Sequence, residues 1–379
     1  MGSERRISRA LRLLEYIVFH PWQTVTILLI GTLLGLGSFY TYQVSAALDG
    51  VAIEEFDPGL ARSAIEGDTS RGRSDPTSDE PSYDLEQEME LIAARFASNR
   101  QSGSFNASAL GEPIDDELFE AYLLVGSDAS GSLADTIILG LMPADGTPPI
   151  MVSLPRDLFV WNLCKQTFTR LNSGLGGCQG VATGFELLAI MVQDYTGIPI
   201  DHLARIDFDG FAQLVDVMGG ITVCVDYPTR DAKSHLSLES AGCRTADGKT
   251  TLAWVRSRHP EQLIDGRWQA VSGSDFTRQD HQQDVLFQLA GKATNLSAPG
   301  ALADRLSVVT SSLRLDSSWN LARAVAAAWS YRGITKESVE RFTISVSEYR
   351  TSYGAEVLVP AEPFKTQLET VHVFGRNRS

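Results

Sequence analysis

The sequence predicts an α/β fold in which a central mixed β-sheet is flanked by helices on both faces and preceded by one N-terminal transmembrane helix. Three apolar runs, at residues 122–127, 136–141 and 150–154, have the length and composition of buried strands. Beyond them, segments with the period of amphipathic helices alternate with short strand-like segments, which is typical of a sheet covered on two faces. An uncharged stretch near the N-terminus adds the transmembrane helix.

The N-terminal segment is predicted to anchor the chain in a membrane. The 23-residue stretch from Trp22 to Val44 contains no charged side chain, and such a helix would extend ~34 Å, enough for a hydrocarbon core of ~30 Å. Four arginines precede it, so residues 1–21 should be cytoplasmic, residues 22–47 should span the cell membrane once, and the remainder should be extracytoplasmic. The alternative is a cleaved secretory signal, because Val44-Ser45-Ala46 resembles a cleavage site; either interpretation exports the remainder.

Residues 48–116 are predicted to form an acidic, flexible linker. Residues 49–90 hold 13 aspartates and glutamates against three arginines, with serine, proline and glycine between them. Such a composition buries too little apolar surface to offset the entropy lost on ordering. The globular domain should therefore comprise residues 117–379. The net charge of -15 argues against non-specific binding to nucleic acid.

Within the globular part, alternating patterns place the remaining elements in order. Apolar side chains at helical spacing, with glycine or proline at the ends, predict the helices. Short runs with alternating apolar residues predict the strands. The expected helices are 182–195, 209–218, 250–258, 277–293, 301–313 and 321–331, and the expected strands are 202–208, 221–225, 342–346 and 357–359.

Charged residues stand at the ends of the first three predicted strands. Asp128 follows the first run, Asp135 begins the second, and Arg156 follows the third directly after a proline. In α/β sheets, ligands bind where strand ends and loops meet, so a site is predicted here. The alternative is that the two aspartates are turn residues and that the arginine forms a surface ion pair.

Four cysteines follow the predicted anchor, an even number that suits two disulfides in an exported domain. The pairing Cys164–Cys178 with Cys224–Cys243 is predicted because each bond closes a short loop, although four cysteines permit three connectivities. A metal site at these cysteines is disfavoured, because no C-x-x-C occurs and no histidine lies near a cysteine at ligand spacing.

Arginines are concentrated in two later segments. The stretch from Trp254 to Arg258 carries two guanidinium groups, and Arg278 and Gln282 lie one helical turn apart on the same predicted face. The planar fork of a guanidinium group suits phosphate oxygens, and several converging groups would suit a pyrophosphate. The alternative is that the first two arginines pair with Asp275 or Glu261 in ordinary surface salt bridges.

Taken together, the motifs of this chain resemble those of the LytR-CpsA-Psr family between residues 120 and 295, in the family's order. The motifs are Leu123 to Asp128, Asp135-Thr136, Ser153 to Asp157, Arg170-Leu171-Asn172, Asp216 with Gly219-Gly220, Ala253 to Arg258, and Asp275-Phe276 with Arg278 and His281-Gln282-Gln283. The resemblance implies a membrane-anchored extracytoplasmic phosphotransferase. Its substrates would be a polyprenyl-pyrophosphate-linked glycopolymer and a peptidoglycan acceptor, and polyprenyl phosphate would be released.

The resemblance also implies roles for individual residues. Asp128 and Asp135 match the carboxylates that hold Mg²⁺ or Mn²⁺, and Asp128 would also be the base for the incoming sugar hydroxyl. The pyrophosphate-binding set is Arg156, Arg170, Arg256, Arg258, Arg278 and Gln282. Of these, Arg156 and Arg256 would act together with Asp128 as the catalytic residues.

The chain departs from the family pattern at three places. The loop between Asp128 and Asp135 is short, His281 stands where the family has arginine, and extra residues occur near Glu261 to Gly273. Two other functions remain open at this point. One is a regulatory protein that binds a lipid pyrophosphate, and the other is a hydrolase that cleaves a polyprenyl-pyrophosphate sugar.

Overall fold

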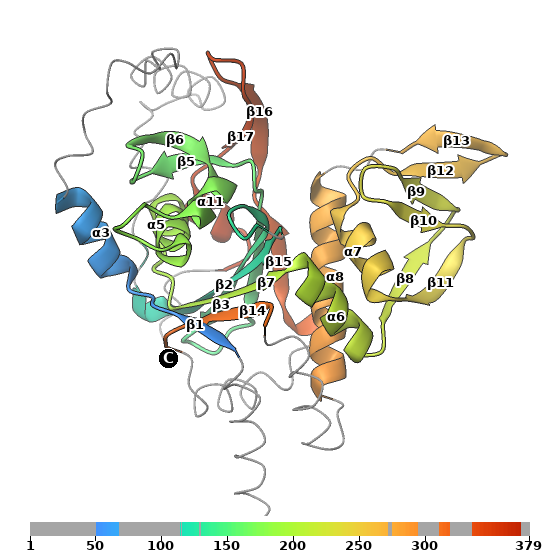
Figure 1. Cartoon of the computed structure of the whole chain (residues 1–379), viewed down its shortest axis with the longest axis horizontal. Coiled ribbons are helices and arrows are strands. Elements are labelled where there is room, and N and C mark those ends of the chain that lie inside the picture. Colours follow the sequence, from blue (N-terminus) through green and yellow to red (C-terminus); the bar gives the residue numbers. More distant parts are fainter. Residues whose placement is uncertain are drawn as a thin grey trace, which may run out of the picture.

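A seven-stranded mixed sheet occupies the centre of the structure, which is a computed structural model describing residues 51–67, 114, 116–128, 130–271, 275–294, 311–318 and 336–372. The strand order is β1-β14-β7-β2-β3-β4-β15 (Figure 1). These strands are β1 (Ala52–Glu54), β14 (Leu313–Asp316), β7 (His202–Asp207), β2 (Phe119–Ser127), β3 (Ala134–Pro143), β4 (Ile150–Leu154) and β15 (Glu340–Thr343).

Strands β2, β3 and β4 form an antiparallel meander at the middle of this sheet. Residues 137–141 of β3 are opposite residues 121–125 of β2 on one side and residues 150–154 of β4 on the other. Outside the meander, β7 runs parallel to β2 and β15 runs parallel to β4. Alternate side chains of β2 are buried, as expected for a strand with period two.

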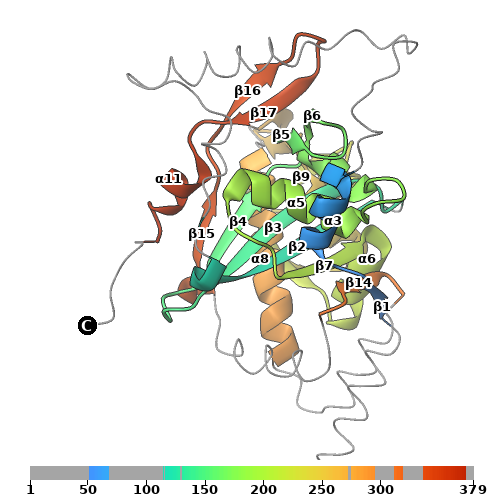
Figure 2. The same ribbon diagram turned by 90° about the vertical axis from the view of Figure 1, so that its left-hand side faces the viewer.

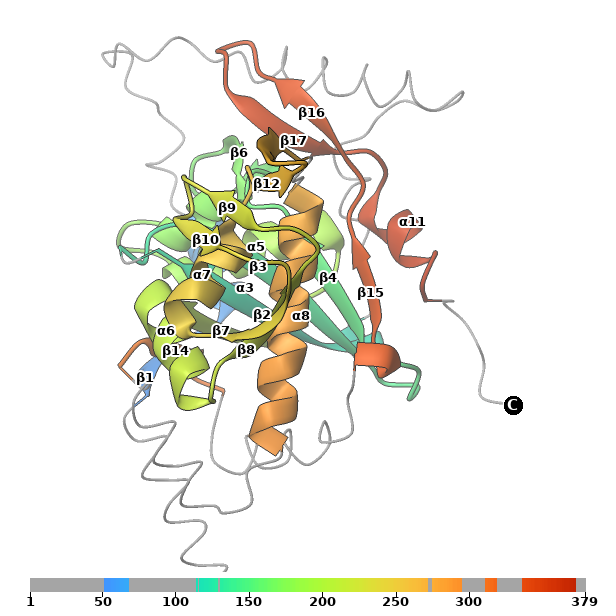
Figure 3. The same ribbon diagram turned by 90° about the vertical axis from the view of Figure 1, so that its right-hand side faces the viewer.

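Helices cover both faces of the sheet. On one face lies α5 (Gly184–Thr196), whose N-terminus has a capping box between Thr183 and Glu186 and whose C-terminus ends at Gly197 in the left-handed region. Next to it lies α3 (Pro58–Gly67), and on the opposite face lies α8 (Asp275–Thr294) (Figures 2 and 3). The main core packs side chains of α5 against those of β2, β3 and β4.

A second, smaller core lies beyond α8. It packs α6 (Phe208–Val217) and α7 (Gly248–Arg256) against β8 (Ile221–Val225), β11 (Gly242–Ala246) and two side chains of α8. A four-stranded sheet in this part contains β10 (Leu236–Leu238), β9 (Thr229–Asp231), β12 (Glu261–Ile264) and β13 (Arg267–Ala270). The extra residues noted near Glu261 therefore form the hairpin β12–β13.

Two further hairpins lie beside the first core. They are β5 (Phe159–Asn162) with β6 (Thr167–Arg170), and β16 (Val346–Arg350) with β17 (Glu356–Pro360). The short helices are η2 (Asp116–Leu118), η3 (Leu171–Gly176), η4 (Lys336–Ser338) and α11 (Phe364–Leu368). Both predicted disulfides are confirmed: Cys164 is bonded to Cys178, and Cys224 on β8 is bonded to Cys243 on β11.

The structure differs from the linker prediction at residues 51–67. These residues form β1, which pairs with β14 at the sheet edge, and α3, which packs on α5. The acidic composition concealed an amphipathic helix: Asp57 accepts a hydrogen bond from the backbone N–H of Leu60 at its start, and Ala61 and Ile65 are buried one turn apart. The rest of the predicted linker falls mostly outside the described residues.

Other predicted elements fall wholly or mostly on residues that the structure does not describe. The expected membrane segment 22–47 and the expected helix 321–331 both lie outside it, and among the residues that are described no helix is long and apolar enough to cross a membrane. The expected helix 301–313 is described only at its end, where Leu313 begins strand β14 instead. That strand forms because Leu313 to Leu315 pair with the backbone of β7.

Candidate active site

The three residues predicted at strand ends lie at the same end of three neighbouring central strands. Because β2, β3 and β4 are antiparallel neighbours, the end of β2, the start of β3 and the end of β4 lie side by side. Asp128 follows β2, Asp135 is the second residue of β3, and Arg156 follows β4. The guanidinium group of Arg156 donates a hydrogen bond to the Asp135 carboxylate, so the structure brings these two predicted residues into direct contact.

The short loop after Asp128 is organised by Asp128 itself. Its carboxylate accepts hydrogen bonds from the Ser130 hydroxyl at 2.7 Å and from the Gly131 backbone N–H at 3.0 Å. Gly131 has φ of 68°, a conformation that favours glycine, and its carbonyl accepts a hydrogen bond from Arg205 of β7 at 3.0 Å. The loop therefore needs few residues, because the carboxylate and a neighbouring strand hold it in place.

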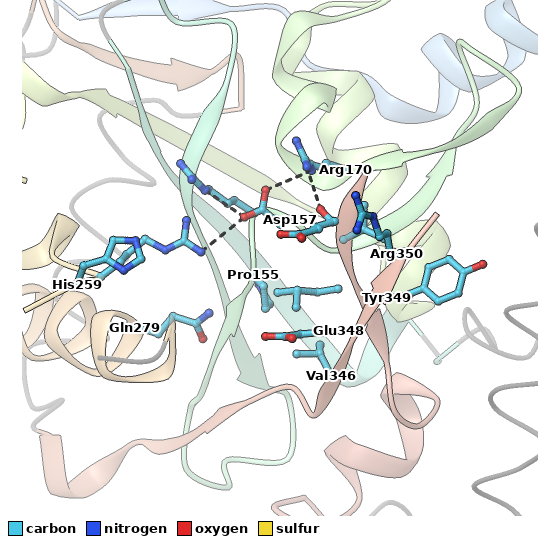
Figure 4. A pocket seen from close by; sticks show the side chains of 14 residues that line it. Pro155, Asp157, Arg170, His259, Gln279, Val346, Glu348, Tyr349 and Arg350 are labelled. Atoms are coloured by element: carbon cyan, nitrogen blue, oxygen red, sulfur yellow. Dashed lines mark hydrogen bonds and ion pairs between the residues drawn. The ribbon is translucent and has the colours of Figure 1, made fainter. Parts of the chain in front are cut away.

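Asp157 contacts three arginines, and sequence reasoning did not assign it to the site. Its carboxylate lies 3.4 Å from Arg156 Nε, 3.4 Å from Arg170 Nε and 3.9 Å from the Arg258 guanidinium (Figure 4). Burial alone would lower the pKa of Arg156, but Asp157 and Asp135 outweigh it and the net pKa is raised. Arg156 therefore remains fully charged.

A cavity of about 290 Å³ lies between the strand ends, α7 and α8. We call it the basic cavity, and its lining residues are Asp135, Thr136, Arg156, Lys233, Ser234, Arg256, Arg258, His259, Arg278 and Gln282. Six of the predicted site residues line it. Arg170 instead lines a neighbouring cavity, where it donates to the carbonyl of Glu356 at 2.8 Å. Asp128 lies outside both sets of lining residues.

Helix α8 contributes two buried residues to the basic cavity. Arg278 and Gln282 are one turn apart, 4% and 7% exposed. Gln282 Nε2 donates to the carbonyl of Val255 in α7 at 3.1 Å, and the adjacent Gln283 donates to Ser153 Oγ of β4 at 2.9 Å. These bonds fix α8 against both α7 and the sheet, and so set the position of Arg278.

Helix α7 ends at the cavity with Arg256. The guanidinium carbon of Arg256 lies 4.5 Å from the centroid of the Phe208 ring, a cation–π contact that orients the side chain. The side chain is exposed, and Ser257, the residue after the helix, has an extended backbone. Glu261, one of the two salt-bridge partners considered in the alternative for Arg256 and Arg258, pairs with Arg230 at 2.7 Å.

Asp231 organises the loops that carry the remaining basic residues. Its buried carboxylate accepts hydrogen bonds from the Ser257 hydroxyl and from the backbone N–H groups of Arg258 and His259, at 2.8 to 3.0 Å. It also accepts one from Lys233 N at 2.9 Å. Burial would raise the pKa of Asp231, but these donors, that of His259 first, outweigh it and hold the pKa at about 2.

Lys233 and Ser234 enter the basic cavity through this arrangement, and sequence reasoning missed both of them. The donors to Asp231 from residues 257–259 are 26 to 28 residues away in the chain, so no local sequence pattern predicts that Lys233 and Ser234 line the cavity. The only nearby signal is that Lys233 follows Asp231, the last residue of β9, by two residues.

His281 does not join the cations of the site. Its ring stacks on the indole of Trp254 at 3.8 Å between centroids, with the planes 22° apart. Burial lowers the pKa of His281 to about 4, with Asp284 opposing the shift, so the ring is neutral at pH 7. His281, at the position where the family has an arginine, therefore packs α8 against α7 in this chain.

The two predicted metal ligands lie at neighbouring strand ends. Across the described part of the chain, no group of three or more histidine, cysteine, aspartate or glutamate residues could hold a metal ion. Mg²⁺ commonly takes only one or two protein carboxylates and completes its shell with water and substrate phosphates. Two carboxylates are thus within the number that such an ion takes from a protein.

A model of the LytR_cpsA_psr family matches residues 83–371. The chain belongs to this family. The match extends beyond residues 120–295, where the motifs lie, and includes both the β12–β13 and β16–β17 hairpins.

Within the family, the chain resembles proteins of cell-wall synthesis. It is 32% identical over 189 residues to the probable cell wall biosynthesis protein LcpB of Corynebacterium glutamicum, covering 50% of this chain and 40% of that protein. It is 26% identical over 199 residues to the polyisoprenyl-teichoic acid–peptidoglycan teichoic acid transferase TagU of Bacillus subtilis, covering 51% and 59%. The matched region thus spans 40% to 59% of these relatives.

A solved structure shares the fold. The LytR-Csp2A-Psr enzyme from Actinomyces oris superposes with a TM-score of 0.54 at 27% identity, covering 68% of this chain and 94% of that one. The predicted α/β architecture, with a mixed sheet between helices, is thus confirmed for the domain.

Proposed function

We propose that this protein is a membrane-anchored, extracytoplasmic phosphotransferase that attaches a glycopolymer from a polyprenyl-pyrophosphate carrier to peptidoglycan. The basic cavity carries the proposal: five cationic side chains line it together with one acidic side chain, the strand-end carboxylate of Asp135. Such a cavity favours a compact, multiply charged anion such as a pyrophosphate. The name of the relative TagU, a teichoic acid transferase, supports the same class of reaction.

The reaction requires little covalent chemistry from the protein. A sugar hydroxyl of the acceptor attacks the phosphorus nearest the glycan, a new O–P bond forms, and the bond to the departing polyprenyl phosphate breaks. The hydroxyl proton passes to the Asp128 carboxylate. Negative charge on the phosphoryl oxygens is stabilised by the cavity's guanidinium groups, and a well-placed donor can contribute ~3 to 4 kcal/mol to such a transition state.

The arginines and carboxylates divide this work. Arg256 and Arg278 approach from α7 and α8, while Arg156 approaches from the sheet edge and is oriented by its contacts with Asp135 and Asp157. Asp128 and Asp135 would hold Mg²⁺ or Mn²⁺, which would neutralise phosphate charge when bound. Fixed donors of this kind stabilise developing charge without reorganising during the reaction.

The direct test is a product analysis with the full chain in lipid vesicles. The protein is incubated with a lipid-linked sugar pyrophosphate, a peptidoglycan acceptor and Mg²⁺, with and without EDTA. We expect the sugar to become linked to the acceptor through a phosphodiester, with loss of transfer in EDTA. Free sugar phosphate alone would indicate a hydrolase, and unchanged substrate with tight binding would indicate a regulatory protein; either result would contradict the proposal.

A further inference from the structure

A second, larger cavity adjoins the basic cavity. It has a volume of about 880 Å³, and we call it the mixed cavity. Arg156, Arg258 and His259 line both cavities, so the two spaces share a wall. Its opposite side is the hairpin β16–β17, which no predicted site residue occupies (Figure 4).

The two cavities differ in charge. Five basic side chains and one acidic side chain line the basic cavity. Four basic and three acidic side chains line the mixed cavity: Arg156, Arg170, Arg258 and Arg350 with Asp157, Glu348 and Glu356. Asp157 moreover contacts three of those four arginines. The mixed cavity therefore offers a second anion much less attraction than the basic cavity does.

The lining also disfavours an isoprenoid tail. A hydrocarbon chain gains free energy only where it removes apolar surface from water, and burying charged groups beside it is costly. Here seven charged side chains line the space, and apolar ones such as Pro155, Val346 and Leu358 lie among them. A neutral ligand with many hydroxyl groups matches this combination.

The positions of single side chains support such a ligand. Figure 4 shows the carboxylate of Glu348, on β16, directed toward Gln279 of α8, and both residues line the cavity together with Pro155. A carboxylate accepts hydrogen bonds from sugar hydroxyls, and guanidinium groups donate to ring and acetamido oxygens. The apolar patches can pack against the C–H face of a pyranose ring, and a cavity of this size is in the range of ordinary ligand sites.

We propose that the mixed cavity is a saccharide subsite in which Glu348 accepts hydrogen bonds from sugar hydroxyls. The inference rests on the proposed function, because the shared wall at Arg156 and Arg258 places this sugar beside the phosphate-binding cavity. The sugar can belong to the donor, next to its pyrophosphate, or to the acceptor glycan. Both sources present the same chemistry to the cavity.

The test is a calorimetric titration of the full chain with three ligands. Geranyl pyrophosphate contains the pyrophosphate without a sugar, geranyl-pyrophosphoryl-N-acetylglucosamine adds the donor sugar, and a phosphate-free peptidoglycan tetrasaccharide represents the acceptor. The variant is Glu348→Ala, with Glu348→Gln as a milder change. The matched control is Glu369→Ala, an exposed glutamate at the end of α11 that does not line the cavity.

We expect Glu348→Ala to weaken one sugar-bearing ligand about tenfold, since a hydrogen bond to a charged group contributes on that order. Geranyl pyrophosphate should bind as in the wild type. A loss confined to the second ligand assigns the donor sugar, and a loss confined to the tetrasaccharide assigns the acceptor. Equal binding of every ligand by Glu348→Ala and the control would overturn the inference alone. Failure of the wild type to bind geranyl pyrophosphate would overturn the proposed function as well.

Discussion

Asp157 and Asp231 both hold the arginine-rich part of the site, but they contact different atoms. Asp157 is partly exposed and pairs with the guanidinium groups of three arginines. Asp231 is buried and binds the backbone N–H groups of Arg258 and His259 and the hydroxyl of Ser257. Asp157 therefore competes with an anionic ligand for the arginine side chains, whereas Asp231 leaves those side chains available.

The difference separates two requirements of the site. Cations crowded around a cavity repel one another, and Asp157 reduces that repulsion while also reducing the attraction for a ligand. The loops that carry the cations must also keep their shape when no ligand is bound, and Asp231 supplies this through backbone contacts. Substitutions at the two carboxylates should therefore have opposite effects on ligand affinity.

The largest effect is expected for Asp231→Ala. The change leaves several buried or partly buried donors without their acceptor, each at a cost of ~1 to 3 kcal/mol, so the free energy of unfolding should fall by at least about 3 kcal/mol. Pyrophosphate binding should weaken as well, because Lys233 and Arg258 lose their fixed positions. Urea unfolding and calorimetry measure the two effects. Asp226→Ala, at an exposed aspartate after β8, is the control, and equal stability of the two variants would disprove the role of Asp231.

A smaller and opposite effect on affinity is expected for Asp157→Asn. Removing a carboxylate from beside a bound anion should tighten inorganic pyrophosphate binding about fivefold, as expected for one charge at short range in a polar site. The free energy of unfolding should fall by only about 1 kcal/mol, since these ion pairs are partly exposed. Calorimetric titration with inorganic pyrophosphate measures the change in affinity. Weaker binding by this variant would show that Asp157 orients the arginines more than it competes for them.

The smallest effect concerns a third carboxylate, Asp316, which lies away from both cavities. Its partner is His202, whose pKa burial would lower but Asp316, Glu120 and Asp201 raise. A raised pKa means that the folded state binds the proton more tightly, so this stabilisation is present below the unfolded pKa of ~6.5 and is lost as pH rises through the folded value.

We therefore expect the unfolding free energy of the wild type to fall between pH 6 and pH 8 as His202 loses its proton. His202→Asn should lack that part of the pH dependence, while its pyrophosphate affinity stays unchanged. Urea unfolding at several pH values measures it. A pH dependence identical to that of the wild type would contradict the assignment.

The sequence was sufficient where the determinants are local. The apolar runs of β2, β3 and β4 identify buried strands, and the charged residues that end them reach one edge because neighbouring strands run antiparallel. The capping residues around α5 and the short disulfide loops are equally local. The family motifs then identified the cavity's arginines, and six of the predicted site residues line it.

The remaining features depend on contacts between distant segments. In the sequence, Asp157 resembles a turn residue paired with the adjacent Arg156. Only the folded structure shows its contacts with Arg170, at the end of β6, and with Arg258, after α7. Arg170 was expected with the pyrophosphate set but lines the mixed cavity, because its partner is the backbone of β17. The helix α3 was hidden in an acidic composition, because only its packing on α5 shows that its apolar residues are buried.

The central claim is that the basic cavity binds and activates a pyrophosphate, and Arg256→Ala tests it most directly. Arg256 is exposed at the end of α7, so the variant should melt like the wild type, while glycan transfer to peptidoglycan should fall at least about 100-fold, the loss of one well-placed charge-stabilising donor. Arg230→Ala is the control, because that arginine is also exposed and contacts Trp268 and Glu261 outside the cavity. Wild-type transfer by Arg256→Ala, or a loss equal to that of Arg230→Ala, would contradict the account.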